Sequence, residues 1–252
     1  MLYPLSDILL LGVIMTLGSI IQGAVGFASG LLGVPLLVLC GFSLPEAAII
    51  NLVSTSVQNF TGTWKLWEHV RLNEMVLPTA IRLVTIPLGT YAVWMVDQRV
   101  GLPQIKQLVG VLLLVIVSLL WGCQVQRRER LNLFWQSLAF STSGFLLGFA
   151  SMGGAPLVLY VNALTWSVAR ARAFLFFCSA VGQPLGAWFL WWKFREEFFT
   201  PACSTLVVLP AIFAGLWIGL HLGSRLSLAL FRRLTIGLIA ATAIAAICAP
   251  FF

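Results

Sequence analysis

The feature of this sequence that most constrains its fold is a succession of long apolar runs separated by short charged gaps. Several runs approach the roughly 20 residues that a helix needs to cross the hydrocarbon core of a bilayer. Only 9% of the residues are charged, whereas an ordinary soluble domain carries about a quarter. We therefore predict a polytopic membrane protein that is surrounded by the lipid bilayer and works inside it.

The apolar segments are expected to be helical, because lipid tolerates only helices and closed barrels and no alternation with a period of two residues is visible. The first segment lacks a basic leader and a cleavage site, so we expect it to be retained. The second segment of each half is short, which predicts either a broken span or a re-entrant half-helix. The expected segments run over about 5–22, 28–42, 45–64, 75–96 and 103–122, and then over about 131–148, 152–164, 167–192, 202–224 and 228–249.

Three short motifs occur twice, in the same order along the chain. The sequence Gly-Phe-Ala-Ser occupies 26–29 and 148–151, Gly-x-Pro-Leu occupies 33–36 and 154–157, and Val-Leu-Pro occupies 76–78 and 208–210. Weak internal symmetry of this kind is typical of transporters. The order of the matches predicts two homologous transmembrane repeats, residues 1–125 and 126–252.

The basic loops predict the topology, because cytoplasmic loops carry an excess of lysine and arginine. We place on the cytoplasmic side the loops that contain Arg127, Arg128 and Arg130, Arg170 and Arg172, and Arg225, Arg232 and Arg233. The first two segments of each half then form a hairpin that crosses twice or not at all. Each half has three or five crossings, and an odd number inverts the second half relative to the first. The predicted fold is all-α, with two inverted structural repeats, each a glycine- and proline-broken helical hairpin followed by three spanning helices.

Over its whole length, with its paired motifs and its Val-Leu-Pro segments, the chain resembles the sulfite exporter TauE/SafE family of the 4-toluene sulfonate uptake permease type. Family members tend to have more consecutive glycines than residues 26–33, and here only Gly153 and Gly154 form a pair. The resemblance implies a secondary transporter, and more specifically an exporter, of small sulfur-containing anions such as sulfite, sulfoacetate or related organosulfonates. It also implies a place in the bacterial inner membrane. The coupling ion, and whether the chain forms a homodimer, stay open.

The glycine- and proline-rich breaks form the first candidate site. An opened helix exposes backbone N–H groups and the positive end of its dipole, which can hold an oxyanion. We expect the helix to open over 26–35 and over 148–156, because glycine and proline are costly inside helices. The alternative is that the glycines only let helices pack closely. The candidate substrate-binding residues are Gln22, Gly26, Ser29, Gly30, Gly33 and Pro35 in the first half and Gly148, Ser151, Gly153, Gly154 and Pro156 in the second.

A second group of candidates consists of polar residues inside expected spans. Asn51, Ser54 or Thr55, Gln58 and Thr61 recur at helical spacing, and in the matching helix Ser179, Gly182, Gln183 and Gly186 do the same. Such residues face a cavity or a neighbouring helix, so substrate binding and hydrogen bonding between helices both remain open. Arg82 is the only basic residue well inside an expected span, where it could attract the anion or snorkel to the interface.

Other function classes are disfavoured. There is no His-Glu-x-x-His motif, two histidines are too few for a histidine-rich metal site, and no intramembrane serine protease motif is present. We therefore expect no enzyme, no metal and no cofactor. The net charge of +7 is collected in loops, so we expect no nucleic acid partner. A passive anion channel, or a carrier for another small organic anion, is the alternative that the residues leave open.

Overall fold

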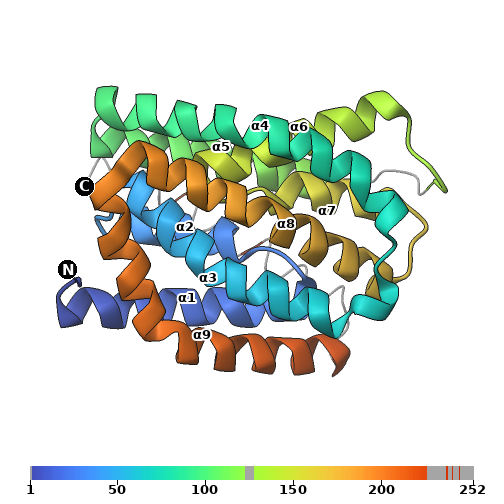
Figure 1. The fold of residues 1–252 in the computed structure, drawn as a ribbon, viewed down its shortest axis with the longest axis horizontal. Coiled ribbons are helices and arrows are strands. Elements are labelled where there is room, and N and C mark those ends of the chain that lie inside the picture. Colours follow the sequence, from blue (N-terminus) through green and yellow to red (C-terminus); the bar gives the residue numbers. More distant parts are fainter. Residues whose placement is uncertain (1, 123–127, 226–236, 238–239, 241–243, 245–252) are drawn as a thin grey trace.

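The structure, a computed structural model, describes residues 2–122 and 128–225 together with residues 237, 240 and 244. The expected segment 228–249 lies outside the described residues, apart from those three. In the described part of the chain the regular elements are helical (Figure 1), with one isolated backbone bridge between Arg128 and Leu164. The helices are α1 (Leu5–Val25), α2 (Ser29–Leu39), α3 (Leu44–Lys65), η1 (Trp67–His69), α4 (Leu72–Arg99), α5 (Leu102–Gly122), α6 (Leu133–Ala150), α7 (Gly154–Asn162), α8 (Val168–Phe194), η2 (Arg195–Phe198) and α9 (Phe199–Arg225).

Matching serine caps start the third helix of each half. Ser43 accepts a hydrogen bond from the backbone N–H of Glu46, whose carboxylate in turn accepts one from the Ser43 N–H at 2.8 Å. Such a capping box satisfies two backbone donors that the helix leaves free. Ser167 accepts from the backbone N–H of Arg170 in the same way. The caps therefore place α3 and α8 in equivalent registers.

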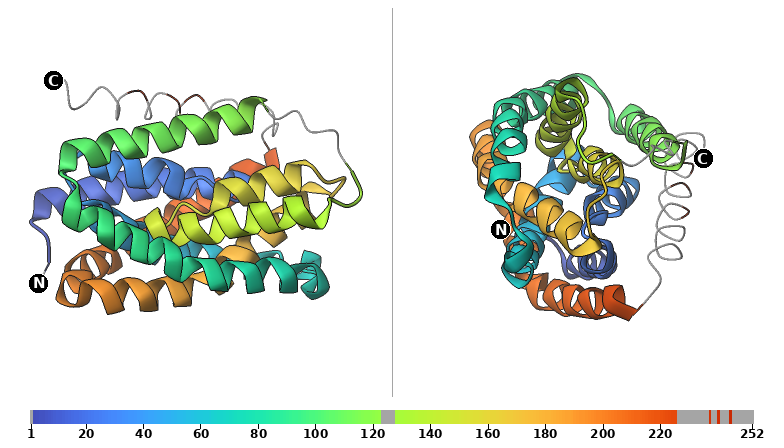
Figure 2. Two further views of the ribbon diagram at one scale, coloured as in Figure 1. Left: turned by 90° about the horizontal axis from the view of Figure 1, so that it is seen from above. Right: turned by 90° about the vertical axis from the view of Figure 1, so that its right-hand side faces the viewer.

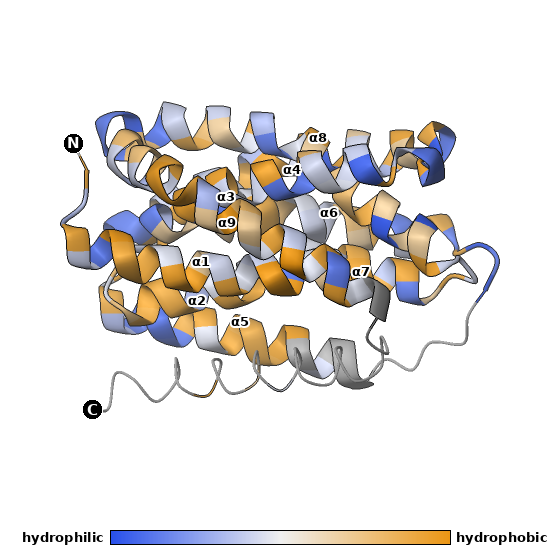
Figure 3. Ribbon diagram, turned by 90° about the horizontal axis from the view of Figure 1, so that it is seen from below, coloured by the Kyte–Doolittle hydropathy of each residue, from blue (hydrophilic) through white to orange (hydrophobic). Residues whose placement is uncertain are grey.

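The helices have the length and composition of membrane spans. Three of them, α1, α4 and α6, are long and apolar enough to cross a bilayer, and so is the stretch Val168–Gly223 that contains α8 and α9. Large apolar side chains point outward, with Leu9 61% exposed and Val84 71% exposed. The most hydrophilic residues gather mainly toward the two ends of the bundle (Figure 3). The chain is a multi-pass membrane protein.

The short helices α2 and α7 each return the chain to the end of the bundle at which their hairpin began. Phe42, just after α2, packs edge-on against Tyr3 before α1, with ring centroids 5.3 Å apart. After α7, the carbonyl oxygen of Ala163 accepts from the N–H of Arg128, which precedes α6. The eleven residues of α2 span ~16 Å and the nine residues of α7 span ~14 Å, about half of the ~30 Å of a bilayer core. Each hairpin therefore starts and ends at the same end of the bundle.

The helices group into two four-helix bodies that exchange one helix between the halves of the sequence. α1 packs on α9, and α4 packs on α6, so each body joins three helices of one half to one helix of the other. The end-on view in Figure 2 shows these two pairs at different edges of the bundle. The first body contains α1, α2, α3 and α9, the second contains α4, α6, α7 and α8, and α3 meets α8 between them.

Glycines make both exchanged pairs close. A Cβ atom on Gly89 of α4 would lie 2.0 Å from the carbonyl oxygen of Phe145 in α6. A Cβ on Gly219 of α9 would lie 2.1 Å from the carbonyl oxygen of Ile20 in α1. At such distances the two backbones touch, which is the usual way in which helices associate in lipid. Each exchanged pair is therefore a tight seam within its own body.

Candidate functional site

Each half contains one break at which a helix ends and a short helix starts. In the first half the backbone turns at Gly26 and Ala28, which have φ values of +87° and +92°. In the second it turns at Ser151, with φ of +55°. Left-handed backbone favours glycine, and Ala28 and Ser151 adopt it without that freedom. The N-terminal ends of α2 and α7 border one common cavity of about 40 Å³, which holds roughly three water molecules.

The breaks are shorter than the sequence predicts, because the prolines do not cause them. Pro35 lies inside α2, which continues to Leu39, and Pro156 lies in the first turn of α7. A first-turn proline loses no hydrogen bond, since its N–H would have had no partner within the helix. The expectation that the helix opens as far as Pro35 and Pro156 is wrong. The chain opens only over 26–28 and 151–153.

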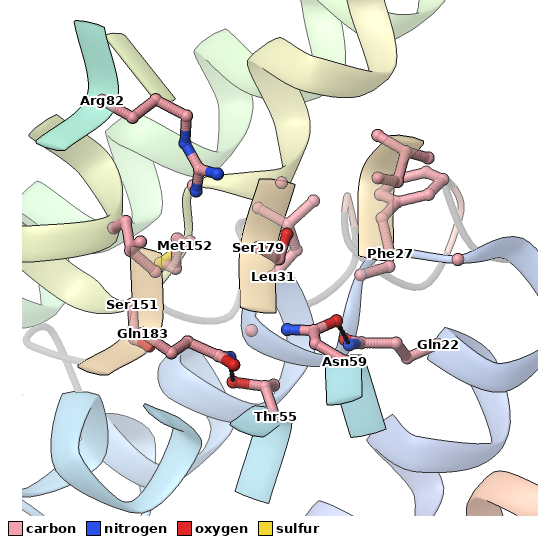
Figure 4. Close-up of a pocket in the computed structure, with 17 residues that line it drawn as sticks. Gln22, Phe27, Leu31, Thr55, Asn59, Arg82, Ser151, Met152, Ser179 and Gln183 are labelled. Carbon is pink, nitrogen blue, oxygen red and sulfur yellow. Dashed lines mark hydrogen bonds between the residues drawn. The ribbon is translucent and has the colours of Figure 1, made fainter. Parts of the chain in front are cut away.

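The cavity gathers seven of the fifteen substrate-binding residues that the sequence predicts, together with Arg82. Residues from α1, α3, α4, α6 and α8 complete its wall, so both bodies contribute to it (Figure 4). The predicted residues that line it are Gln22, Gly26, Gly30, Arg82, Ser151, Gly153, Gly154 and Gln183. Those that do not line it are Ser29, Gly33, Pro35, Asn51, Ser54, Gln58, Gly148 and Pro156.

The polar wall of the cavity is duplicated. Thr55 and Asn59 lie 12 and 16 residues after the cap Ser43, and Ser179 and Gln183 lie 12 and 16 residues after the cap Ser167. All four line the cavity. Residues four apart share one face of a helix. Equivalent faces of α3 and α8 therefore supply a hydroxyl and an amide each.

Hydrogen bonds link these polar groups to the breaks. Gln22 Nε2 donates to Asn59 Oδ1 at 2.8 Å, and Gln22 Oε1 accepts from the backbone N–H of Ser29 at 3.3 Å. Gln183 Nε2 donates to Thr55 Oγ1 at 2.8 Å, across the contact between the two bodies (Figure 4). Each amide is thus oriented by a partner on another helix.

Arg82 is the charged group of the cavity. Its side chain is 1% exposed and extends from α4 toward the other lining residues (Figure 4). One guanidinium nitrogen, Nη1, donates to the carbonyl oxygen of Cys178 in α8, whereas Nε and Nη2 have no hydrogen-bond partner. Among the described residues the ion pair is Arg170 with Glu74, so no carboxylate neutralises Arg82. The snorkelling alternative for Arg82 is wrong, because the side chain turns inward.

Several predicted site residues serve contacts between helices. Asn51 Nδ2 donates to the carbonyl oxygen of Ser151 at 2.8 Å, so it ties α3 to the second break. Gln58 donates to Ser54 and to Ser19 of α1. A Cβ on Gly148 would lie 2.1 Å from the carbonyl oxygen of Ile86, so this glycine belongs to the seam between α4 and α6. For Gly148 the close-packing alternative describes the structure.

Sequence reasoning did not select some of the lining residues. Asn59 could have been found, because it follows Thr55 by four residues on the same face of α3. The apolar lining residues could not be recognised in the sequence, because apolar residues with the same spacing occur throughout the chain. Thr55 and Ser179 are candidates that the sequence predicts on the two polar helix faces, and the additional lining residues are Phe27, Ala28, Leu31, Asn59, Leu147, Met152 and Leu175.

In this helical membrane protein two broken helices meet at a cavity lined by both polar and apolar residues. A sequence profile of the sulfite exporter TauE/SafE family matches residues 10–246. The chain belongs to this family. Comparison with curated proteins and with solved structures found no match.

Proposed function

We propose that the protein is a secondary carrier that exports small sulfur-containing anions, such as sulfite, sulfoacetate or related organosulfonates, by alternating access in the bacterial inner membrane. The observation that carries the proposal is Arg82, a buried guanidinium with two unpartnered nitrogens and no carboxylate beside it. A buried charge without a counter-charge is strongly unfavourable. A bound anion supplies the missing charge.

The two short helices add to the attraction. The backbone N–H groups in the first turn of a helix point along its axis and carry about half a positive charge together. α2 and α7 present such ends at the cavity, and no side chain caps α7. Thr55, Ser179 and the two amides provide hydrogen-bond partners that suit an oxyanion. The site binds a small anion without needing a second full positive charge.

We infer that the two halves are inverted repeats. α1 and α6 run in opposite directions through the bundle, as do α4 and α9 (Figure 1). The exchange of α4 and α9 between the two bodies has the same pattern in both halves. The basic end of the bundle is placed in the cytoplasm by the positive-inside rule. In the described part of the chain that end carries the basic residues Lys65, Arg71, Arg128, Arg130, Arg170, Arg172 and Arg225 with the acidic Glu68, Glu74 and Glu129. The opposite end carries the acidic residues Asp7, Glu46, Asp97, Glu196 and Glu197 with the basic Arg99, Lys106, Lys193 and Arg195, so the excess of basic residues lies at the first end.

Alternating access follows from a tilt of one body against the other. The seams between α1 and α9 and between α4 and α6 keep each body rigid. The cavity lies where the bodies meet, beside the contact of α3 with α8. Because few polar bonds cross this contact, among them Gln183 to Thr55 and Asn51 to Ser151, a small tilt exchanges them for contacts with the anion.

Flux into reconstituted vesicles tests this function. Labelled sulfite, sulfoacetate and sulfate are offered to vesicles that contain the purified protein, and initial rates are measured against concentration. A carrier saturates and shows counterflow, whereas a passive channel shows neither. Absence of saturable flux for all three anions would contradict the substrate assignment. Saturable flux of a different small organic anion would support the carrier mechanism and assign a different substrate.

A further inference from the structure

A second cavity of about 110 Å³ lies between the first break and the end of the hairpin formed by α6 and α7. Val25 and Phe27 form one wall, and Val158, Asn162 and Trp166 form another. It is bounded by the loop that joins α7 to α8 and by the first turns of α8. These elements belong to the basic end of the bundle.

Arg172 is the charged group in this second cavity. Its Nη2 donates to the carbonyl oxygen of Gly23 at 2.7 Å, and its Nε is buried without a partner. No carboxylate pairs with it in the part of the chain that the structure describes. Arg170, two residues earlier, differs in both respects, because it pairs with Glu74 and lies 4.4 Å from the centre of the Trp166 ring. The charge of Arg172 is thus uncompensated and directed at a cavity.

Phe27 and Leu175 line both cavities, so they separate the second cavity from the one that contains Arg82. Phe27 lies between the two left-handed residues of the first break, and a Cβ on Gly154 would be 3.5 Å from its Cβ atom. In Figure 4 it lies on the far side of the drawn group from Arg82. Phe27 and Leu175 together therefore form the partition between the two cavities.

We propose that the second cavity is a separate anion subsite, in which Arg172 holds a small oxyanion on the cytoplasmic side while Phe27 and Leu175 close the way to the central cavity. The proposal rests on the proposed function for its direction and cargo class. Arg172 also connects the subsite to the break, because its Cγ lies 3.4 Å from the position of a Cβ on Gly26. An anion at Arg172 therefore lies next to the first break, the segment that contains Phe27 and that must move to open the way to the central cavity.

Thiol labelling tests the subsite without requiring transport. In a full-length background with the native cysteines replaced by alanine, Asn162→Cys is modified with methanethiosulfonate reagents of opposite charge. We expect the anionic reagent to be favoured, and Arg172→Gln to reduce this preference about tenfold at low ionic strength. Sulfate should slow the labelling with Arg172 present and not in Arg172→Gln.

Arg170→Gln is the matched control, because it removes the same charge two residues away and outside the cavity. It should change the preference less than twofold. Equal effects of Arg170→Gln and Arg172→Gln, or no effect of either, would overturn the subsite. A normal charge preference in a protein without anion flux would contradict the proposed function and leave the subsite standing.

A second labelling site tests the partition. Ser179→Cys lies in the central cavity, and we expect Phe27→Ala to accelerate its modification from the cytoplasmic side at least tenfold. Phe27→Leu, which keeps a large side chain, should leave the rate within about twofold of the parent. An unchanged rate in Phe27→Ala would show that Phe27 does not close the passage.

Discussion

The two breaks perform the same structural task by different backbone routes. The first turns over Gly26 and Ala28, both left-handed, and holds the start of α2 through the side chain of Gln22. The second uses one left-handed residue, Ser151, and is tied down by Ser143, whose hydroxyl donates to the Gly153 carbonyl oxygen at 2.5 Å. The two breaks therefore place their short helices alike, whereas the local bonds that hold them differ.

The two halves differ more strongly in the charge that they contribute to the cavity. Alignment of the two Val-Leu-Pro motifs places Ala214 of α9 opposite Arg82 of α4, so only one half contributes a positive charge to the cavity. The polar faces of α3 and α8, by comparison, are equivalent in register. The equivalent polar faces of α3 and α8 form the wall of the site. Arg82, which has no counterpart in the other half, supplies the net charge that a single anion requires.

The largest effect is expected from Arg82. Arg82→Gln should lower kcat/KM for anion flux at least about 100-fold, because the buried site loses its only full charge. Arg82→Lys should retain part of the activity, since it keeps the charge and loses the planar fork. Concentration-dependent uptake into vesicles measures both. Arg71→Gln, which removes an exposed charge at the start of the same helix, is the control and should behave like the parent.

Gly30 and Gly154 compare the starts of the two short helices. A Cβ on Gly30 would lie 2.7 Å from Asn51 Nδ2 and 2.8 Å from the Ser151 carbonyl oxygen, whereas a Cβ on Gly154 meets nothing closer than 3.5 Å. Gly30→Ala should lower the free energy of unfolding by about 1–3 kcal/mol. Gly154→Ala should be nearly neutral. Thermal unfolding in detergent measures the change in stability of each variant. Equal destabilisation by Gly30→Ala and Gly154→Ala would contradict the described packing.

The amides test whether the two halves share the work of binding. Asn59→Ala and Gln183→Ala should each weaken anion binding by about tenfold, because each removes a hydrogen-bonding group at an equivalent position. Titration of the purified protein with sulfite measures the two affinities. Thr61→Ala on α3, outside the lining, provides the baseline. A large difference between the two amide variants would mean that the anion lies closer to one body.

The smallest effect concerns backbone strain. Ala28→Gly should raise the free energy of unfolding by up to about 1 kcal/mol, because its φ of +92° suits glycine. Gly26→Ala at φ of +87° should lower it by about 1–2 kcal/mol. Unfolding temperatures of the two variants in the same detergent give the sign. If both substitutions were neutral, the first break would not be constrained as described.

The sequence allowed the described helices and the approximate positions of both breaks to be predicted, because hydropathy and local chemistry determine them. It could not show how far each break extends, since Pro35 is accommodated inside a helix by its packing. Nor could it show that Arg82 turns inward toward α8, or that Gly148 touches Ile86. These features depend on how helices rotate against partners distant in the chain, which composition and spacing do not encode.

The pairing of α1 with α9 has a consequence for biosynthesis. α1 meets α9 only when residues 199–225 have been made. At 5–20 residues per second, that is a delay of roughly 10–40 s. The body containing α4 and α6 becomes complete earlier, as soon as α8 has emerged. The nascent chain therefore completes its second body first, while α1 has α2 and α3 as neighbours but still lacks α9.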